Sequence, residues 1–95
     1  MSLQLLEGIQ DLLRLSRQAA DSESQFGPAW ILDQSLAAID ALVQMETAAL
    51  GGKLKVGPNF SFRARLGASW VDLHGDIYAL CERLDGRIRS GGLDV

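Results

Sequence analysis

The sequence predicts a mainly α-helical fold, a small three-helix bundle with a short β-hairpin or loop between helices 2 and 3. Apolar residues recur at helical spacing in three segments that glycine and proline separate. Aromatic residues make up only 6% of the chain, so the core must consist mainly of Leu, Ile, Val and Ala. With 95 residues there is room for one domain, residues 1–95, with helices at about 2–21, 28–50 and 67–90 and the hairpin or loop at 53–65.

The first helix is amphipathic. Its apolar stripe advances in alternating steps of three and four residues, the spacing that keeps side chains on one helix face. The stripe consists of Leu6, Ile9, Leu13, Ser16 and Ala20. Charged and amide side chains occupy the opposite face, so this helix presents one side to the core.

The second helix is apolar over more of its circumference than the first. Pro28 suits the first helical turn and Gly51-Gly52 suits the end. One stripe consists of Leu32, Leu36, Ile39, Val43 and Leu50, and a second of Ile31, Ala38, Leu42, Met45 and Ala49. Because two neighbouring helices cannot cover both stripes, the sequence predicts a homodimer or an obligate partner protein.

The segment 53–65 breaks the helical pattern. Apolar and polar residues alternate over Lys53–Val56 and again over Phe60–Arg63, with the turn-forming residues Gly57–Asn59 between them. This pattern predicts a β-hairpin with one apolar and one basic face. An irregular loop is the alternative.

The third helix is expected to begin near Gly67–Trp70, with Ser69 as its N-cap. Its apolar positions repeat in steps of four and three, as in a coiled-coil seam. The seam consists of Leu66, Trp70, Leu73, Ile77, Leu80 and Leu84. The pattern predicts one unbroken helix over 67–90.

Asp72, His74 and Asp76 are the first candidates for metal binding or acid–base chemistry. On a continuous helix, however, residues two apart point roughly 200° away from each other, so His74 faces away from both carboxylates. Cys81 lies seven residues, or about 10 Å along the helix, from His74, too far for the imidazole to activate the thiol. We therefore predict no catalytic residue, no metal and no cofactor. A small enzyme or enzyme subunit using these residues is the least favoured hypothesis.

The residues most suggestive of partner binding lie on and near the basic segment. The protein carries a net charge of -3, yet the only charged residues between Ala48 and Val71 are four cations. The candidate contact residues are Lys53, Lys55, Phe60, Phe62, Arg63, Arg65 and, at the start of the second helix, Trp30. An acidic partner protein or nucleic acid would suit this surface. The plainer alternative is that the phenylalanines cap the core while the cations are solvated.

The function we expect is that of a non-catalytic protein–protein interaction module. It would be a small adaptor, chaperone or inhibitor that docks on a larger protein as a homodimer. A nucleic-acid-binding regulator using the basic 53–65 hairpin is the alternative.

The start of the chain lacks the features of a secretory signal, and no run of eighteen apolar residues occurs. We therefore expect a cytoplasmic protein of bacterial or phage origin, without membrane contact.

Overall fold

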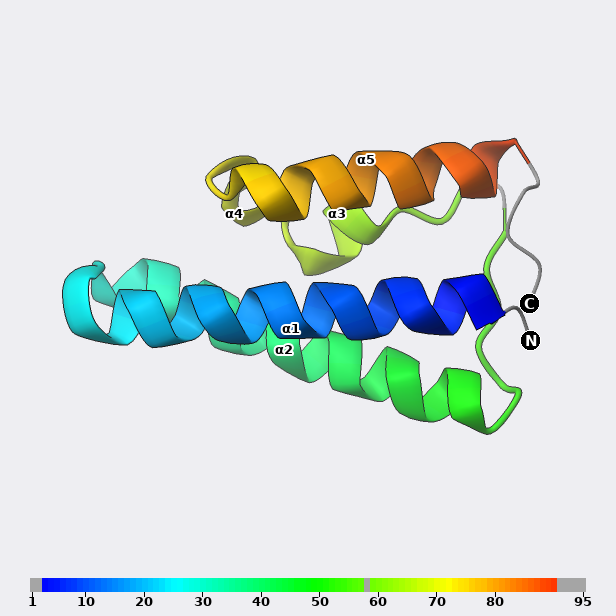
Figure 1. Cartoon of the computed structure of the whole chain (residues 1–95), viewed down its shortest axis with the longest axis horizontal. Helices are drawn as coiled ribbons and strands as arrows, with labels where there is room; N and C mark the ends of the chain where they lie inside the picture. Colours follow the sequence, from blue (N-terminus) through cyan, green and yellow to red (C-terminus); the bar gives the residue numbers. More distant parts are fainter. Residues whose placement is uncertain (1–2, 58, 91–95) are drawn as a thin grey trace.

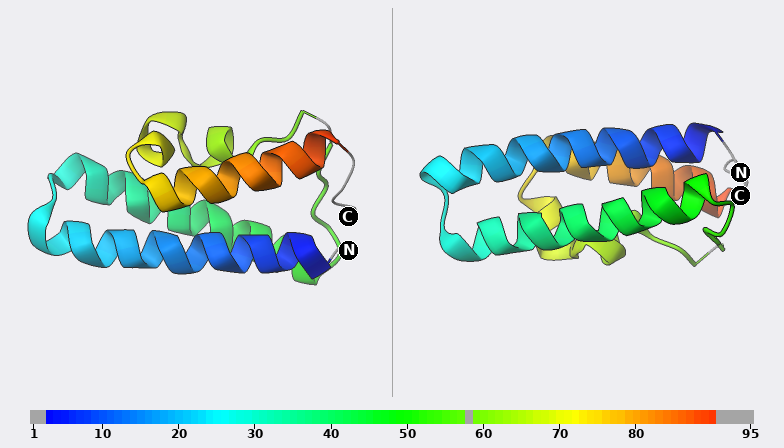
Figure 2. Two further views of the ribbon diagram at one scale, coloured as in Figure 1. Left: turned by 45° about the horizontal axis from the view of Figure 1, so that its top comes forward. Right: turned by 90° about the horizontal axis from the view of Figure 1, so that it is seen from below.

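The computed structural model describes residues 3–57 and 59–90. The helices in this part of the chain are α1 (Leu3–Phe26), α2 (Ala29–Leu50), α3 (Phe62–Leu66), α4 (Ala68–Asp72) and α5 (Gly75–Arg89). α1 and α2 form a long antiparallel hairpin, and α5 runs along α1 on its other side (Figure 1). The short helices α3 and α4 contact both α2 and α5, closing the side of the bundle (Figure 2). The prediction of a mainly helical fold is confirmed.

α1 extends to Phe26, beyond the predicted end near residue 21. The polar residues after Ala20 stay helical because Glu23 turns its carboxylate inward, where Ser35 of α2 and His74 contact it. The chain then reverses at Gly27 and Pro28. Pro28 has an extended backbone (φ -65°, ψ 149°), and its carbonyl accepts the first hydrogen bonds of α2, from the N–H groups of Ile31 and Leu32.

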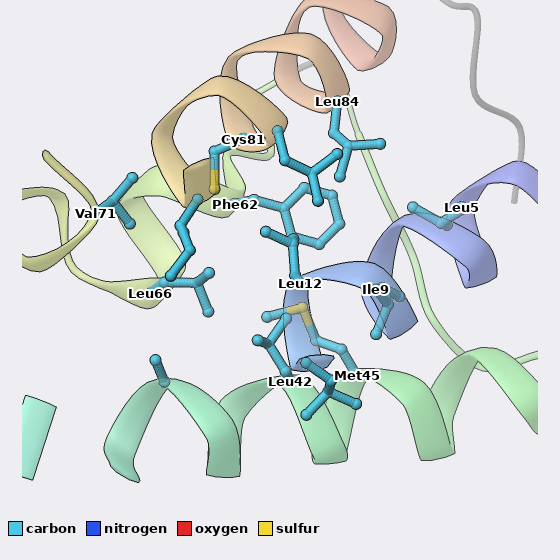
Figure 3. Close-up of a cluster of buried hydrophobic side chains, with 14 of the residues drawn as sticks. Leu5, Ile9, Leu12, Leu42, Met45, Phe62, Leu66, Val71, Cys81 and Leu84 are labelled. Carbon is cyan, nitrogen blue, oxygen red and sulfur yellow. The ribbon is translucent and has the colours of Figure 1, made fainter. Parts of the chain in front are cut away.

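The core lies between α1, the inner side of α2 and the C-terminal helices. Figure 3 shows side chains from all these elements meeting, with Phe62 and Leu12 at the centre. The buried apolar residues of the first two helices are Leu5, Leu6, Ile9, Leu12, Leu13, Ala38, Leu42, Met45 and Ala49. Those of the C-terminal half are Phe62, Leu66, Trp70, Val71, Ile77, Leu80, Cys81, Leu84 and Ile88. Each large side chain buried here contributes about 1.5–3 kcal/mol to stability.

Of the two alternatives predicted for 53–65, the hairpin is not confirmed, and the described residues between α2 and α3 form a loop. No residue in 3–57 or 59–90 belongs to a β-strand, and the predicted turn residue Pro58 lies outside the described residues. The chain instead leaves α2 in a loop and enters the short helix α3 at Phe62. The reason is tertiary: Asp85 of α5 accepts hydrogen bonds from the backbone N–H groups of Phe62 (2.7 Å) and Arg63 (3.4 Å). These N–H groups would pair with a second strand in a hairpin, but here they form the first turn of a helix.

The predicted third helix, 67–90, is interrupted at Leu73 and His74. Gly67, with φ +101°, separates α3 from α4, so it takes the N-cap position expected for Ser69. The backbone of His74 is extended (φ -120°, ψ 97°) and begins α5. The break rotates the two parts of the expected seam relative to each other. Of the six residues of the predicted seam, Leu73 is 55% exposed and the other five are buried.

Candidate functional site

A buried polar network joins α1, α2, α4 and the start of α5. The indole N–H of Trp70 donates to the hydroxyl oxygen of Ser35 at 2.7 Å, and the Ser35 hydroxyl donates to the carboxylate of Glu23. The second carboxylate oxygen of Glu23 contacts Nε2 of His74, while Nδ1 of His74 lies 2.9 Å from the backbone carbonyl of Trp70. Glu23 and His74, which are 51 positions apart in the chain, are thereby in direct contact.

The partners of His74 define where its protons lie. A backbone carbonyl only accepts hydrogen bonds, so Nδ1 carries a hydrogen and donates it to Trp70. Nε2 faces a carboxylate oxygen of Glu23, and one proton bridges the two groups. Both ring nitrogens are therefore occupied. In this arrangement His74 has no free nitrogen to act as a base, a nucleophile or a metal ligand, and its role is to hold the start of α5 against α1.

An open cleft of about 360 Å³ lies next to this network. It is lined by Leu15, Gln18, Ala19, His74, Gly75, Asp76 and Ile77. Because the ring nitrogens of His74 point to Glu23 and Trp70, the polar groups free to face the cleft are Gln18 and Asp76, both exposed. The cleft thus lacks the convergent, buried polar groups of a small-molecule site.

Asp72, His74 and Asp76 do not share a continuous helix, because α4 ends at Asp72 and α5 begins at Gly75. Asp72 is paired instead with Arg63, whose Nε lies 2.9 Å from Oδ1 and whose second guanidinium nitrogen lies 2.6 Å from Oδ2. Hydrogen bonding to Arg63 lowers the pKa of the Asp72 carboxyl. Across residues 3–57 and 59–90, no three His, Cys, Asp or Glu side chains are grouped as a metal would require.

Cys81 is fully buried in the core, where it packs as a small apolar residue. Burial raises the pKa of its thiol to about 12, with a further contribution from the neighbouring carboxylate of Asp85. A thiol that stays protonated and inaccessible is not a nucleophile.

Asp85 itself is 3% exposed and is a residue that sequence reasoning missed. Besides the N–H groups of α3, it accepts a hydrogen bond from the hydroxyl of Ser61 at 2.9 Å.

The structure divides the predicted basic contact surface. Lys53, Lys55 and Arg65 are exposed, whereas Arg63 is held by Asp72. The guanidinium carbon of Arg65 lies 5.3 Å from the ring centroid of Phe60, a cation–π contact.

The two phenylalanines of this segment have different environments. Phe60 is half-buried and meets Phe62 edge to face, with the ring centroids 5.0 Å apart. Phe62 is completely buried, so its side chain is not available to a partner. It serves the core, which was the alternative to a contact role. An open cleft of about 430 Å³ remains in front of Lys55, Phe60 and Arg65.

Trp30 is 56% exposed, in the first turn of α2. It lines a small cleft of about 250 Å³ with Gln34 of α2 and with residues 67–70. Trp30 is therefore accessible, and the cleft that it lines differs from the cleft in front of Lys55, Phe60 and Arg65. The structure therefore does not bring the sequence-predicted contact residues together on a single surface.

The outer side of α2 carries several exposed apolar side chains. We call Leu32, Leu36, Ile39, Val43 and Leu50 the outer stripe. Leu36, Val43 and Leu50 are 52%, 38% and 62% exposed, and Leu32 and Ile39 are half-buried. The inner face of the same helix consists of Ser35, Ala38, Leu42, Met45 and Ala49, all buried. Of the two stripes read from the sequence, the fold covers only the inner one.

Comparison with protein-family models, curated proteins and solved structures finds no significant match for this chain. Within the described residues, no helix combines the length and the apolar character needed to cross a membrane. The class of protein defined by fold and surface is thus a small helical bundle with an uncovered apolar helix face.

Proposed function

We propose that this protein is a non-catalytic docking module that binds another protein chain through the outer stripe of α2. The observation that carries the proposal is the exposure of three large aliphatic side chains along one line of one helix. Single exposed apolar residues are ordinary on protein surfaces, but several that are aligned on one face of one helix are typical of an interface. Covering them removes apolar surface from water, and this drives association.

The rigidity of α2 supports this role. Its inner face is anchored by Leu42 and Ala49, both fully buried, and by the hydrogen bonds of Ser35 to Trp70 and Glu23. A helix held in this way presents the outer stripe in a fixed geometry, so little conformational entropy is lost when a partner binds. Helix-to-helix docking through apolar residues three and four apart is a common mode of recognition.

We propose no catalytic role because the reactive side chains of the described residues are either engaged in contacts or buried. His74 has both ring nitrogens engaged, and Cys81 is buried with a raised thiol pKa. The carboxylates of Asp72 and Asp85 are occupied by Arg63 and by backbone N–H groups. These residues hold the fold together.

Nucleic-acid binding by the 53–65 segment receives less support. Asp72 offsets the charge of Arg63, and Phe62 is inaccessible for base stacking. Lys53, Lys55 and Arg65 remain, on a protein whose net charge is -3. Binding of this kind would weaken steeply with salt and would be lost when these three cations are changed to Ala.

Site-specific photo-crosslinking in the native cell tests the docking function. A photoreactive amino acid replaces Leu36 in the outer stripe or, as a matched control, Glu82 on the exposed side of α5. We expect one defined crosslinked protein from position 36 and none from position 82. The proposal fails if position 36 gives no adduct, or if both positions give the same mixture.

A further inference from the structure

We infer that the outer stripe receives an amphipathic helix from a different protein, one that carries Lys or Arg at seven-residue spacing along one flank of its apolar side. This inference rests on the proposed docking function and adds the chemistry of the partner. Its evidence is the charge pattern beside the outer stripe, which is independent of the exposure that carries the docking function.

The outer stripe has the spacing of a helix-pairing seam. From Leu32 its members follow in steps of four, three and four residues to Val43; Glu46 occupies the next position of this spacing, and Leu50 the one after it. This 3.5-residue period keeps the side chains facing a second helix that lies alongside. A partner helix with the same period would interdigitate with the stripe from Leu32 to Val43, a length of about 17 Å at about 1.5 Å per residue.

Two carboxylates form an edge beside the outer stripe. Asp33 and Asp40 lie about 40–60° around the helix from Leu36, on the solvent side of the stripe, and about 10 Å apart along the axis. Both are exposed, and neither makes an ion pair within 3–57 and 59–90. Asp40 accepts a hydrogen bond from the side chain of Gln44 on its own helix, at 3.0 Å. This pair of aspartates, the acidic edge, corresponds to the flanking positions where paired helices carry complementary charges.

No cation of this chain lies near the acidic edge in sequence. Between Arg17 and Lys53 the chain holds five acids and no Lys, Arg or His. The two aspartates one heptad apart therefore match cations one heptad apart on the incoming helix. Such pairs, partly desolvated by the neighbouring apolar contact, add specificity and speed association.

The acidic edge also disfavours a second copy of this chain as the occupant. When two identical helices pair antiparallel about a two-fold axis, the same edge of each helix meets the same edge of its mate. Pairing centred between Ile39 and Val43 then places Asp40 of one copy against Asp40 of the other. Like charges in contact oppose such a pairing, whereas a basic partner helix removes the repulsion.

The inference is tested with synthetic helical peptides that share one apolar stripe at steps of three and four. One peptide carries Lys at seven-residue spacing on a flank, a second carries Glu at the same positions, and a third is a scrambled version of the first. Binding to the full chain is followed by fluorescence anisotropy at low and high salt. We expect the Lys peptide to bind, the Glu peptide to bind about two- to tenfold more weakly, and added salt to narrow this difference in affinity.

Charge reversal then locates the contact. In the double variant Asp33→Lys/Asp40→Lys, the Lys peptide should lose about two- to tenfold in affinity, as expected for two exposed ion pairs, and the Glu peptide should gain. The matched control, Glu7→Lys/Glu82→Lys, makes the same change of net charge at exposed acids on α1 and α5 and should leave the preference intact. Circular dichroism of each variant verifies that the fold is retained.

The outcomes separate this inference from the proposed function. Equal binding of the Lys and Glu peptides, or an equal effect of the control reversal, overturns the inference. Concentration-dependent self-association that Leu36→Glu abolishes overturns it too, because a second copy is then the occupant. If no peptide binds while crosslinking from position 36 still captures one defined protein, the inference is wrong and the docking function stands. If crosslinking also fails, both are wrong.

Discussion

The two sides of α2 are similarly apolar, but one is buried in the core and the other is largely exposed. Leu42 on the inner face is fully buried between α1 and the C-terminal helices, whereas Leu36 on the outer stripe is 52% exposed. Both belong to one helix with the same backbone geometry. The comparison shows that the apolar residues of α2 exceed what this fold covers, so only one side of the helix contributes fully to the stability of the monomer.

Truncating one leucine on each side tests this difference most strongly. Leu42→Ala should lower the free energy of unfolding by about 2–5 kcal/mol, because it leaves a cavity in a packed core. Leu36→Ala should lower it by less than about 1 kcal/mol, because half of that side chain already contacts water. Urea denaturation followed by circular dichroism measures both. Equal losses would mean that something covers the outer stripe in solution.

The polar residues of α2 differ in the same way between its buried and exposed sides, and the expected loss of stability on substitution is smaller than for the leucines. Ser35→Ala removes a hydroxyl that accepts from Trp70 and donates to Glu23 in the buried network, and we expect a loss of about 1–3 kcal/mol. Thr47→Ala on the exposed side removes a hydroxyl that donates only to the carbonyl of Val43, and the change should stay within about 0.5 kcal/mol.

The fluorescence of Trp70 reports the same change, because its indole N–H loses its partner in Ser35→Ala but not in Thr47→Ala. Thermal unfolding followed by tryptophan emission therefore measures both variants. If Ser35→Ala is as stable as the native chain, the network does not contribute to stability.

The exposed ion pair between Arg63 and Asp72 should give the smallest effect and a distinct pH dependence. Arg63 lowers the pKa of Asp72 below its ordinary value of 3.8, so the pair contributes fully to stability above that pH. The contribution is lost as pH falls through the lower, folded-state pKa. Asp72→Asn should therefore be slightly less stable than the native chain at pH 7 and indistinguishable from it in strong acid.

Asp33→Asn is the control for the ion pair, since Asp33 has no cation beside it in the described structure and its removal should not reproduce this pH dependence. A stability difference for Asp72→Asn that persists unchanged into strong acid would contradict the assignment. Urea denaturation repeated across the acid range measures it.

Much of the local structure was predictable because it depends on short-range apolar periodicity and on the glycine and proline residues that mark helix ends. The predicted boundaries Pro28 and Gly51 correspond closely to those of α2. The stripe from Leu6 to Ala20 lies within α1, which continues to Phe26. Helical spacing also identified both apolar stripes of α2. Spacing alone, however, does not say which stripe a neighbouring helix covers, since that depends on where α1, α3 and α4 pack.

The errors occurred where a distant residue supplies the decisive contact. Phe60–Arg63 alternates like a strand, yet the carboxylate of Asp85, 23 residues from Phe62, accepts from the backbone and starts α3. Leu73 continues a heptad, yet the chain turns there because His74 reaches Glu23, 51 residues away. No local pattern contains either partner.

The sequence by itself thus determined the helical class, the limits of α2 and the surplus of apolar residues on α2, since these follow from residue spacing and backbone chemistry. Only the tertiary structure decided which face of α2 is left open, and that His74, Ser35 and Glu23 hold the bundle together. The physical reason is that burial and long-range hydrogen bonds arise only when segments distant in the chain are packed together.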